Sequence, residues 1–199
     1  MGVGMELLVV QWPKVEAMEP GDRQDLLTDA AFGEVYSHDL LEHGWSWPTR
    51  EGEDWYGRYA FKRTLGSYKP HFWATHRWDH LREFVDPDVR EVLDLFLDAL
   101  IWDGLESTEN AGTGLPERAP AWDADLLVCR PPEDLPLIAG WWRKAAPQLE
   151  TLRTQFDRQA AAPDGWVSTF EEFSDLLTDW GEIAMEAERR GWGIVGLRC

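Results

Sequence analysis

Histidine is concentrated in one short part of this sequence. All five histidines of the 199-residue chain fall between positions 38 and 80, as His38, His43, His71, His76 and His80. An imidazole ring can act as a general acid or base, and it is also the commonest metal ligand. Any chemistry that depends on histidine is therefore expected from this part of the chain.

Two of these histidines have the spacing of a metal site on a helix. If a helix begins at His76 after a cap at Thr75, then His80 lies one turn later on the same face, and Glu83 follows. Two imidazoles at this spacing can share a divalent metal such as zinc, which Glu83 or His71 can complete. The glutamate of the zinc protease helix motif is missing, and a solvated helix face with two histidines explains the same pattern.

The stretch 55–82 combines basic and aromatic side chains within an acidic protein. It holds six basic residues, one acidic residue and eight aromatic residues. Alternation over 55–63 predicts a half-buried strand, and a turn at Gly66 and Ser67 predicts a return strand over 68–73, at a sheet edge because of Pro70.

This predicted hairpin has the composition of a site for a small anion. Arginine and lysine bind phosphate or carboxylate groups, and tyrosines stack on ligands or donate hydrogen bonds. The residues expected to line the site are Tyr56, Arg58, Tyr59, Lys62, Lys69 and His71. The alternative is that the aromatic side chains face the core and the basic ones pair with acidic residues elsewhere.

Signatures of several enzyme classes are absent. The sequence has no phosphate-binding glycine loop, no dinucleotide fingerprint, no Gly-x-Ser-x-Gly elbow and no CxxC. Asp123 and Asp125 precede an apolar strand, whereas a phosphatase with an aspartyl nucleophile has its strand before such a pair. The absences favour a protein that is not an enzyme, although acid–base chemistry by histidine and glutamate needs no local motif.

Short apolar runs predict the strands that accompany this hairpin. They lie at 5–12, 125–129 and 192–197. The first and the last are both apolar and short, so we expect them to pair in the centre of the sheet.

Helical periodicity predicts the remaining elements. Helices are expected over 20–31, over 87–102 after a cap at Asp86, and over 131–161 with an interruption at Pro147. A last helix begins at a capping box of Ser168 and Glu171 and ends at Gly191.

The order of these elements lacks the regular strand–helix alternation of a doubly wound sheet. We therefore predict one domain over 1–199 of the α+β class, dominated by helices, with a small mixed sheet of about four to five short strands.

Charge and cysteine content limit the partners and the compartment. The net charge of −18 disfavours duplex nucleic acid and anionic lipid, which are bound through basic patches, and permits a basic partner. Cys129 and Cys199 form no disulfide framework, and the first ten residues do not resemble a signal peptide. We predict a cytoplasmic protein that contacts neither duplex nucleic acid nor a membrane.

Composition and two short sequence segments indicate the kind of organism from which the chain comes. The chain is rich in tryptophan, with 13 residues, and GSYKPHFW (66–73) and RRGWGIVGL (189–197) resemble small uncharacterised proteins of GC-rich actinobacteria. The resemblance implies a bacterial source and transfers no activity or functional residue.

Two functions remain open from the sequence. The first is a non-enzymatic interaction protein whose acidic surface neutralises a basic protein partner such as a toxin or nuclease. The second is a small-anion-binding or metal-assisted hydrolytic domain centred on the hairpin 55–82. A pocket lined by the residues of the hairpin would favour the second, and a continuous acidic surface would favour the first.

Overall fold

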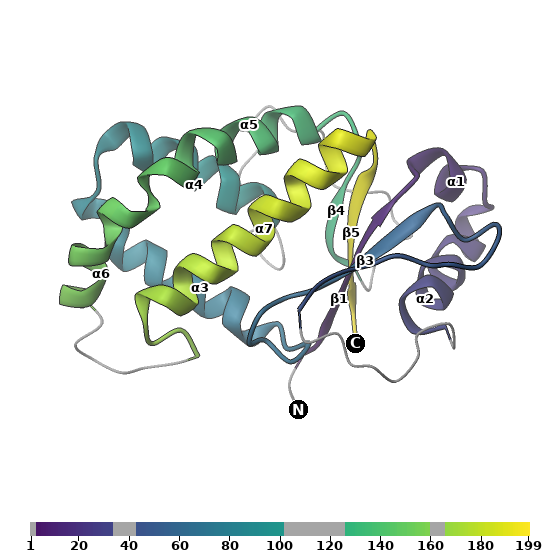
Figure 1. Ribbon diagram of the computed structural model, residues 1–199, viewed down its shortest axis with the longest axis horizontal. Helices are drawn as coiled ribbons and strands as arrows, with labels where there is room; N and C mark the ends of the chain where they lie inside the picture. The colour runs from purple at the N-terminus through teal and green to yellow at the C-terminus, as the bar shows by residue number, and fades with distance from the viewer. Residues whose placement is uncertain (1–2, 34–42, 102–125, 160–165) are drawn as a thin grey trace.

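The chain folds into one five-stranded sheet with helices on both faces (Figure 1). The computed structural model describes residues 3–33, 43–101, 126–159 and 166–199. The strands are β1 (Met5–Val10), β2 (Gly44–Ser46), β3 (Tyr56–Ala60), β4 (Leu126–Arg130) and β5 (Gly193–Arg198). Their order across the sheet is β2-β3-β1-β5-β4.

The two apolar terminal strands lie next to each other inside the sheet, as predicted. Leu8 of β1 pairs with Val195 of β5. Both strands are mostly apolar because both faces of the sheet are covered: Leu7 and Val9 enter the larger core, and Leu8 and Val10 enter the smaller one. Burying each such side chain stabilises the fold by about 1.5–3 kcal/mol.

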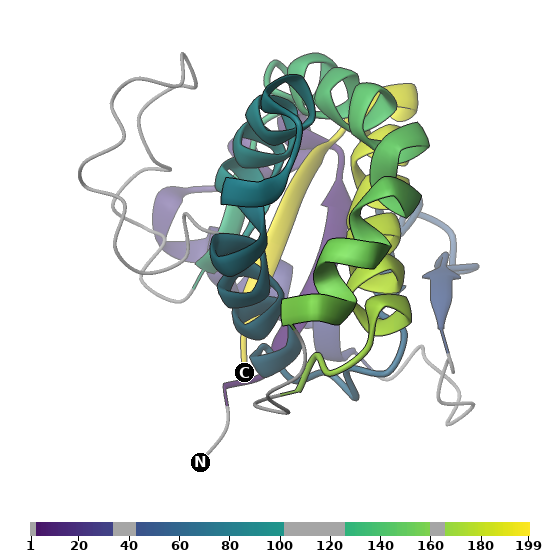
Figure 2. The same ribbon diagram turned by 90° about the vertical axis from the view of Figure 1, so that its left-hand side faces the viewer.

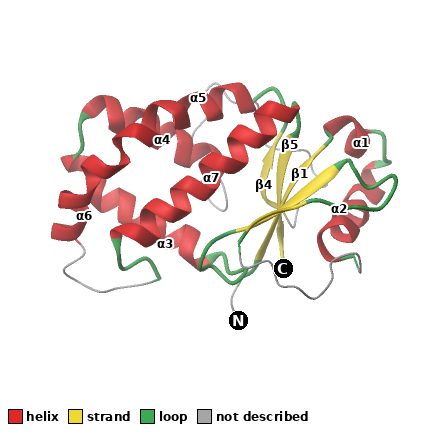
Figure 3. Ribbon diagram, in the orientation of Figure 1, coloured by secondary structure: helices red, strands yellow, loops and turns green. Residues whose placement is uncertain are grey.

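The helices divide unequally between the two faces (Figures 1 and 3). Helices α1 (Trp12–Glu16) and α2 (Arg23–Phe32) cover the face of the smaller core. The other face carries α3 (Lys69–Leu81), α4 (Pro87–Leu100), α5 (Leu135–Ala145), α6 (Arg153–Gln159) and α7 (Phe170–Arg190). Figure 2 looks onto this second layer, with the strands behind it.

The α+β class with helices in excess is confirmed. The sheet was expected to be mixed, but all four pairings among the described strands are antiparallel. The 21-residue α7 leads directly into β5. Its apolar stripe packs on the sheet and on α5, and Trp180, Ile183 and Ala184 are completely buried.

The predicted return strand over 68–73 is wrong, because these residues begin α3. Pro70 stands in the first helical turn, where the missing amide proton costs nothing, and not at a sheet edge. Left-handed backbone at Arg63, Leu65 and Gly66 turns the chain out of the sheet instead of folding it into a hairpin. The partners of β3 are β1 and β2.

Two predicted helix caps also need correction. Thr75 lies inside α3, where its hydroxyl donates to the carbonyl of Phe72 at 2.6 Å. The capping box of α7 consists of Thr169 and Glu172, one residue later than expected, because Thr169 is the last residue with extended backbone. The caps expected at Asp86 and Gly191 are confirmed.

Some predictions fall outside the described residues. They concern His38 and the pair Asp123 and Asp125. Among the residues that the structure describes, no helix is both long enough and apolar enough to cross a membrane.

Candidate metal site

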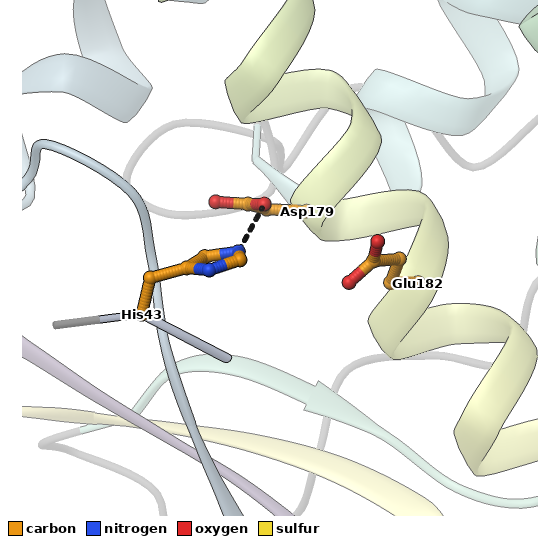
Figure 4. A group of neighbouring side chains, drawn as sticks. All are labelled: His43, Asp179 and Glu182. Atoms are coloured by element: carbon orange, nitrogen blue, oxygen red, sulfur yellow. Dashed lines mark ion pairs between the residues drawn. The ribbon is translucent and has the colours of Figure 1, made fainter. Parts of the chain in front are cut away.

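Three potential metal ligands meet between α7 and the chain that enters β2. Figure 4 shows His43 extending towards Asp179 and Glu182, which lie on neighbouring turns of α7. One ligand atom from each side chain lies within 4.8 Å of the others. In the described ranges, no other set of three or more histidine, cysteine, aspartate or glutamate side chains has this geometry.

The local structure explains why these residues meet. Asp179 and Glu182 are three positions apart on α7, so they share a helix face. On the sheet, Trp45 of β2 pairs with Tyr59 of β3. His43 comes just before β2, and its ring meets that of Tyr59 edge to face with 6.2 Å between centroids. The face of the sheet that carries Tyr59 is the one covered by α7.

Asp179 is the buried centre of the site. Its side chain is completely buried, and its Oδ2 accepts the backbone N–H of Lys62 at 2.8 Å. Its Oδ1 accepts the hydroxyl of Tyr59 at 3.0 Å and lies 3.6 Å from His43 Nε2. Burial raises the pKa of the Asp179 carboxyl, and the hydrogen bonds from Lys62 and Tyr59 and the nearby imidazole oppose that rise.

Tyr59 connects the two carboxylates. Its hydroxyl lies 3.0 Å from Asp179 Oδ1 and 2.8 Å from Glu182 Oε2. Burial and both carboxylates raise the pKa of Tyr59, so the phenol keeps its proton. One hydroxyl proton serves one acceptor, yet two carboxylate oxygens lie within reach. The hydroxyl proton can therefore point fully at only one of these two oxygens.

Aromatic rings close the site on the sheet side. Trp45 stacks on Trp47 with 5.0 Å between centroids, and its ring meets that of Tyr59 edge to face at 4.9 Å. Gly57 makes room for this stack, because a Cβ there would lie 2.1 Å from the Trp47 ring. The Asp179 side chain is completely buried, whereas His43 keeps 36% of its side chain exposed.

The residues predicted to form an anion pocket do not come together. Tyr56 and Arg58 lie on the opposite face of the sheet, where Tyr56 joins the smaller core and Arg58 pairs with Glu6 at 2.9 Å. Tyr59 and Lys62 belong to the site described above. The Lys62 ammonium lies 3.7 Å from Asp175, one turn earlier on α7.

The other two residues of that predicted pocket lie on α3. Lys69 is exposed at the start of the helix, with its ammonium over the Trp166 ring at 5.5 Å. His71 is buried in the core and accepts the indole N–H of Trp180 at 3.1 Å. Burial lowers the pKa of His71 to about 3, so this imidazole stays neutral.

The predicted metal ligands on α3 are brought together in part. His76 and His80 are both exposed on α3, with 4.6 Å between ring centroids. Glu83 lies beyond the helix, in the 3₁₀ turn Arg82–Phe84. These three are not among the described residues that converge as a metal-ligand group, whose members are His43, Asp179 and Glu182.

Sequence reasoning missed the two carboxylates of α7, although one signal pointed to them. The apolar stripe of this helix runs through Leu176, Trp180 and Ile183, and Asp179 lies within it. A charged residue at a position that helical periodicity buries needs a specific partner. His43 carried no comparable local signal, because its partners are more than 130 residues away in the sequence.

Comparison with models of known protein families, with curated proteins and with solved structures finds no match. The site must therefore be interpreted from its own geometry.

Proposed function

We propose that this chain binds a divalent metal ion at His43, Asp179 and Glu182 and acts in metal-assisted hydrolysis of a small substrate. The observation that carries the proposal is the position of the Tyr59 hydroxyl, which lies within hydrogen-bond distance of both carboxylates. Two carboxylates this close repel each other unless a proton or a cation lies between them. An exposed imidazole beside them favours the metal ion.

The ligand types suit a particular group of metals. One imidazole with two carboxylates is a mixed nitrogen and oxygen set, which is typical of zinc and of manganese. The Lys62 N–H donates to Asp179 Oδ2, the oxygen other than the one nearest His43, and so holds the carboxylate as the outer partners of metal ligands usually do. Three protein ligands leave coordination positions for water and substrate, the arrangement of a catalytic rather than a structural metal site.

The first test is titration of the full-length protein with MnCl₂ and ZnCl₂ by calorimetry. Wild-type protein is expected to bind Mn²⁺, and Asp179→Asn to weaken that binding by roughly 100-fold, because loss of a mere outer partner already costs about 10–100-fold. Without metal, Asp179→Asn should be more stable at pH 7 by about 0.5–2 kcal/mol, since it removes a buried charge.

A neighbouring carboxylate gives the matched control. Asp175 lies one turn before Asp179 on α7. The substitution Asp175→Asn removes only partly exposed ion pairs with Lys62 and Arg63. It should leave Mn²⁺ affinity unchanged. The proposal is wrong if wild-type protein takes up neither metal, or if the two aspartate variants bind both metals equally well. Urea unfolding of all three proteins supplies the stability comparison.

A basic protein partner is a second proposal, favoured by the net charge of −18. Exposed apolar side chains, among them Phe72 and Trp166, support a contact surface of this kind. The test is co-elution with a panel of basic bacterial nucleases at low salt, with nuclease activity as the readout. Inhibition of one nuclease would support the proposal, and unchanged activity across the panel would contradict it.

We further propose that the protein is bacterial and cytoplasmic. Its two cysteines are both unpaired, which fits a reducing compartment. Neither statement affects the metal-site proposal.

A further inference from the structure

A small pocket lies between α3 and α6, apart from the site on α7. Its volume is about 140 Å³. Trp73 and Phe156 form its aromatic walls, and His76, His80 and Gln159 supply nitrogen and oxygen atoms. Arg77 and Leu81 complete the lining, and none of its described residues carries a carboxylate. The two imidazoles are therefore the strongest potential metal ligands in this pocket.

The tautomer of His80 is fixed by the helix itself. Its Nδ1 lies 2.9 Å from the backbone carbonyl oxygen of His76. A carbonyl oxygen only accepts hydrogen bonds, so Nδ1 carries the proton and Nε2 keeps its lone pair. Metal-binding histidines typically have this arrangement, in which one ring nitrogen donates to a carbonyl and the other binds the ion.

His76 is well placed to supply the second nitrogen. The two rings are 4.6 Å apart between centroids and inclined at 37°. The Trp73 ring lies edge to face against His76 at 5.2 Å, which restricts the motion of that imidazole. Because the His76 carbonyl holds the His80 ring and Trp73 contacts the His76 ring, less side-chain freedom remains to be lost when an ion binds.

We infer that His76 and His80 form a second metal site, selective for nitrogen-preferring ions such as Cu²⁺ and Ni²⁺. An imidazole pair without a carboxylate favours these ions over Mg²⁺, Ca²⁺ and Mn²⁺, which prefer oxygen ligands. Gln159, which also lines the pocket, offers a carbonyl oxygen as a third ligand. This site is independent of the one at Asp179, and either can exist without the other.

The test uses full-length protein carrying Asp179→Asn, which removes a ligand of the α7 site. Titration with CuCl₂ and NiCl₂ is followed by calorimetry, and bound Cu²⁺ by electron paramagnetic resonance. One ion is expected per chain, with hyperfine coupling to imidazole nitrogen. His76→Gln or His80→Gln should each lower the affinity by roughly tenfold or more, since even outer partners contribute about 10–100-fold.

Glu83→Gln is the matched control, because Glu83 does not line the pocket. Protein that carries Asp179→Asn and Glu83→Gln should bind Cu²⁺ with the same affinity as protein that carries Asp179→Asn alone. The inference is overturned if Cu²⁺ fails to bind, if binding is indifferent to both histidine substitutions, or if Glu83→Gln weakens it as much as they do. His76 and His80 are exposed, so circular dichroism of these variants should show an unchanged fold.

Discussion

Burial opposes the ionisation of two side chains of opposite charge, Asp179 and His71. Burial raises the pKa of the Asp179 carboxyl and lowers the pKa of the His71 imidazole to about 3. Their effects on stability have opposite signs. Asp179 lowers stability as pH rises through its folded-state pKa, whereas His71 lowers stability as pH falls below its unfolded-state pKa.

The His71 effect gives a pH-dependent prediction. Below about pH 6.5 the His71 imidazole of the unfolded chain becomes protonated, whereas that of the folded chain stays neutral down to about pH 3. By pH 4 the loss of stability from this residue is on the order of 3 kcal/mol. His71→Gln keeps a hydrogen-bond acceptor for Trp180 but does not titrate, so its stability should fall less between pH 7 and pH 4.

Urea unfolding at several pH values measures this difference. His76→Gln is the control, because it removes an exposed imidazole from the same helix and leaves the buried His71 in place. Parallel pH profiles for wild type and His71→Gln would contradict the assignment of His71 as a buried neutral base.

The chemistry of single residues could be predicted from the sequence only where their partners are local. The spacing of His76 and His80 predicted that their rings lie side by side on one helix, and they do, whereas metal binding there stays a prediction. Tyr59 and Lys62 were predicted to bind a ligand, but their neighbours on α7 were not identified, because nothing local links β3 to a helix that begins more than 100 residues later. Tertiary packing alone brings Asp179 to the Tyr59 hydroxyl.

At the scale of elements, most helices and strands were predictable because their apolar periodicity is strong. Helix α4 begins at the cap expected at Asp86, and β1 pairs with β5 as expected. The prediction of a strand over 68–73 was wrong because the aromatic residues and Pro70 fit either an edge strand or a first helical turn. Burial of His71, Ala74 and Trp78 at helical spacing decides in favour of the helix.

The start of α7 provides a prediction at this scale. Thr169 accepts the N–H of Glu172, so Thr169→Ala removes the cap and should lower the free energy of unfolding by about 1 kcal/mol. Ser168 contacts the Glu172 side chain without capping a helical N–H, so Ser168→Ala should cost less. Thermal unfolding of the two variants checks the order, and a larger loss for Ser168→Ala would place the cap one residue earlier.

For the whole molecule, net charge is a source of instability that salt can reduce. A charge of −18 repels itself in the compact state. The screening length falls from about 30 Å at 0.01 M salt to about 10 Å at 0.1 M. The melting temperature should therefore rise with NaCl, by roughly 2–4 °C for each 1 kcal/mol of repulsion removed.

Choline chloride distinguishes screening from cation binding in this experiment. An equal rise in both salts is expected, because screening depends on ionic strength and not on the identity of the cation. A melting temperature that falls with salt would mean that attractive ion pairs, such as Arg58 with Glu6, outweigh the repulsion.

The stacked pair of Trp45 and Trp47 provides an intrinsic spectroscopic probe of the site on α7. The pair fits against Gly57, and Trp45 touches the ring of Tyr59, whose hydroxyl joins the two carboxylates of the site. Any ion that draws Asp179 and Glu182 together must shift Tyr59 and, through it, the surroundings of both indoles. Near-ultraviolet circular dichroism and tryptophan emission should therefore report occupancy of the site without an added label.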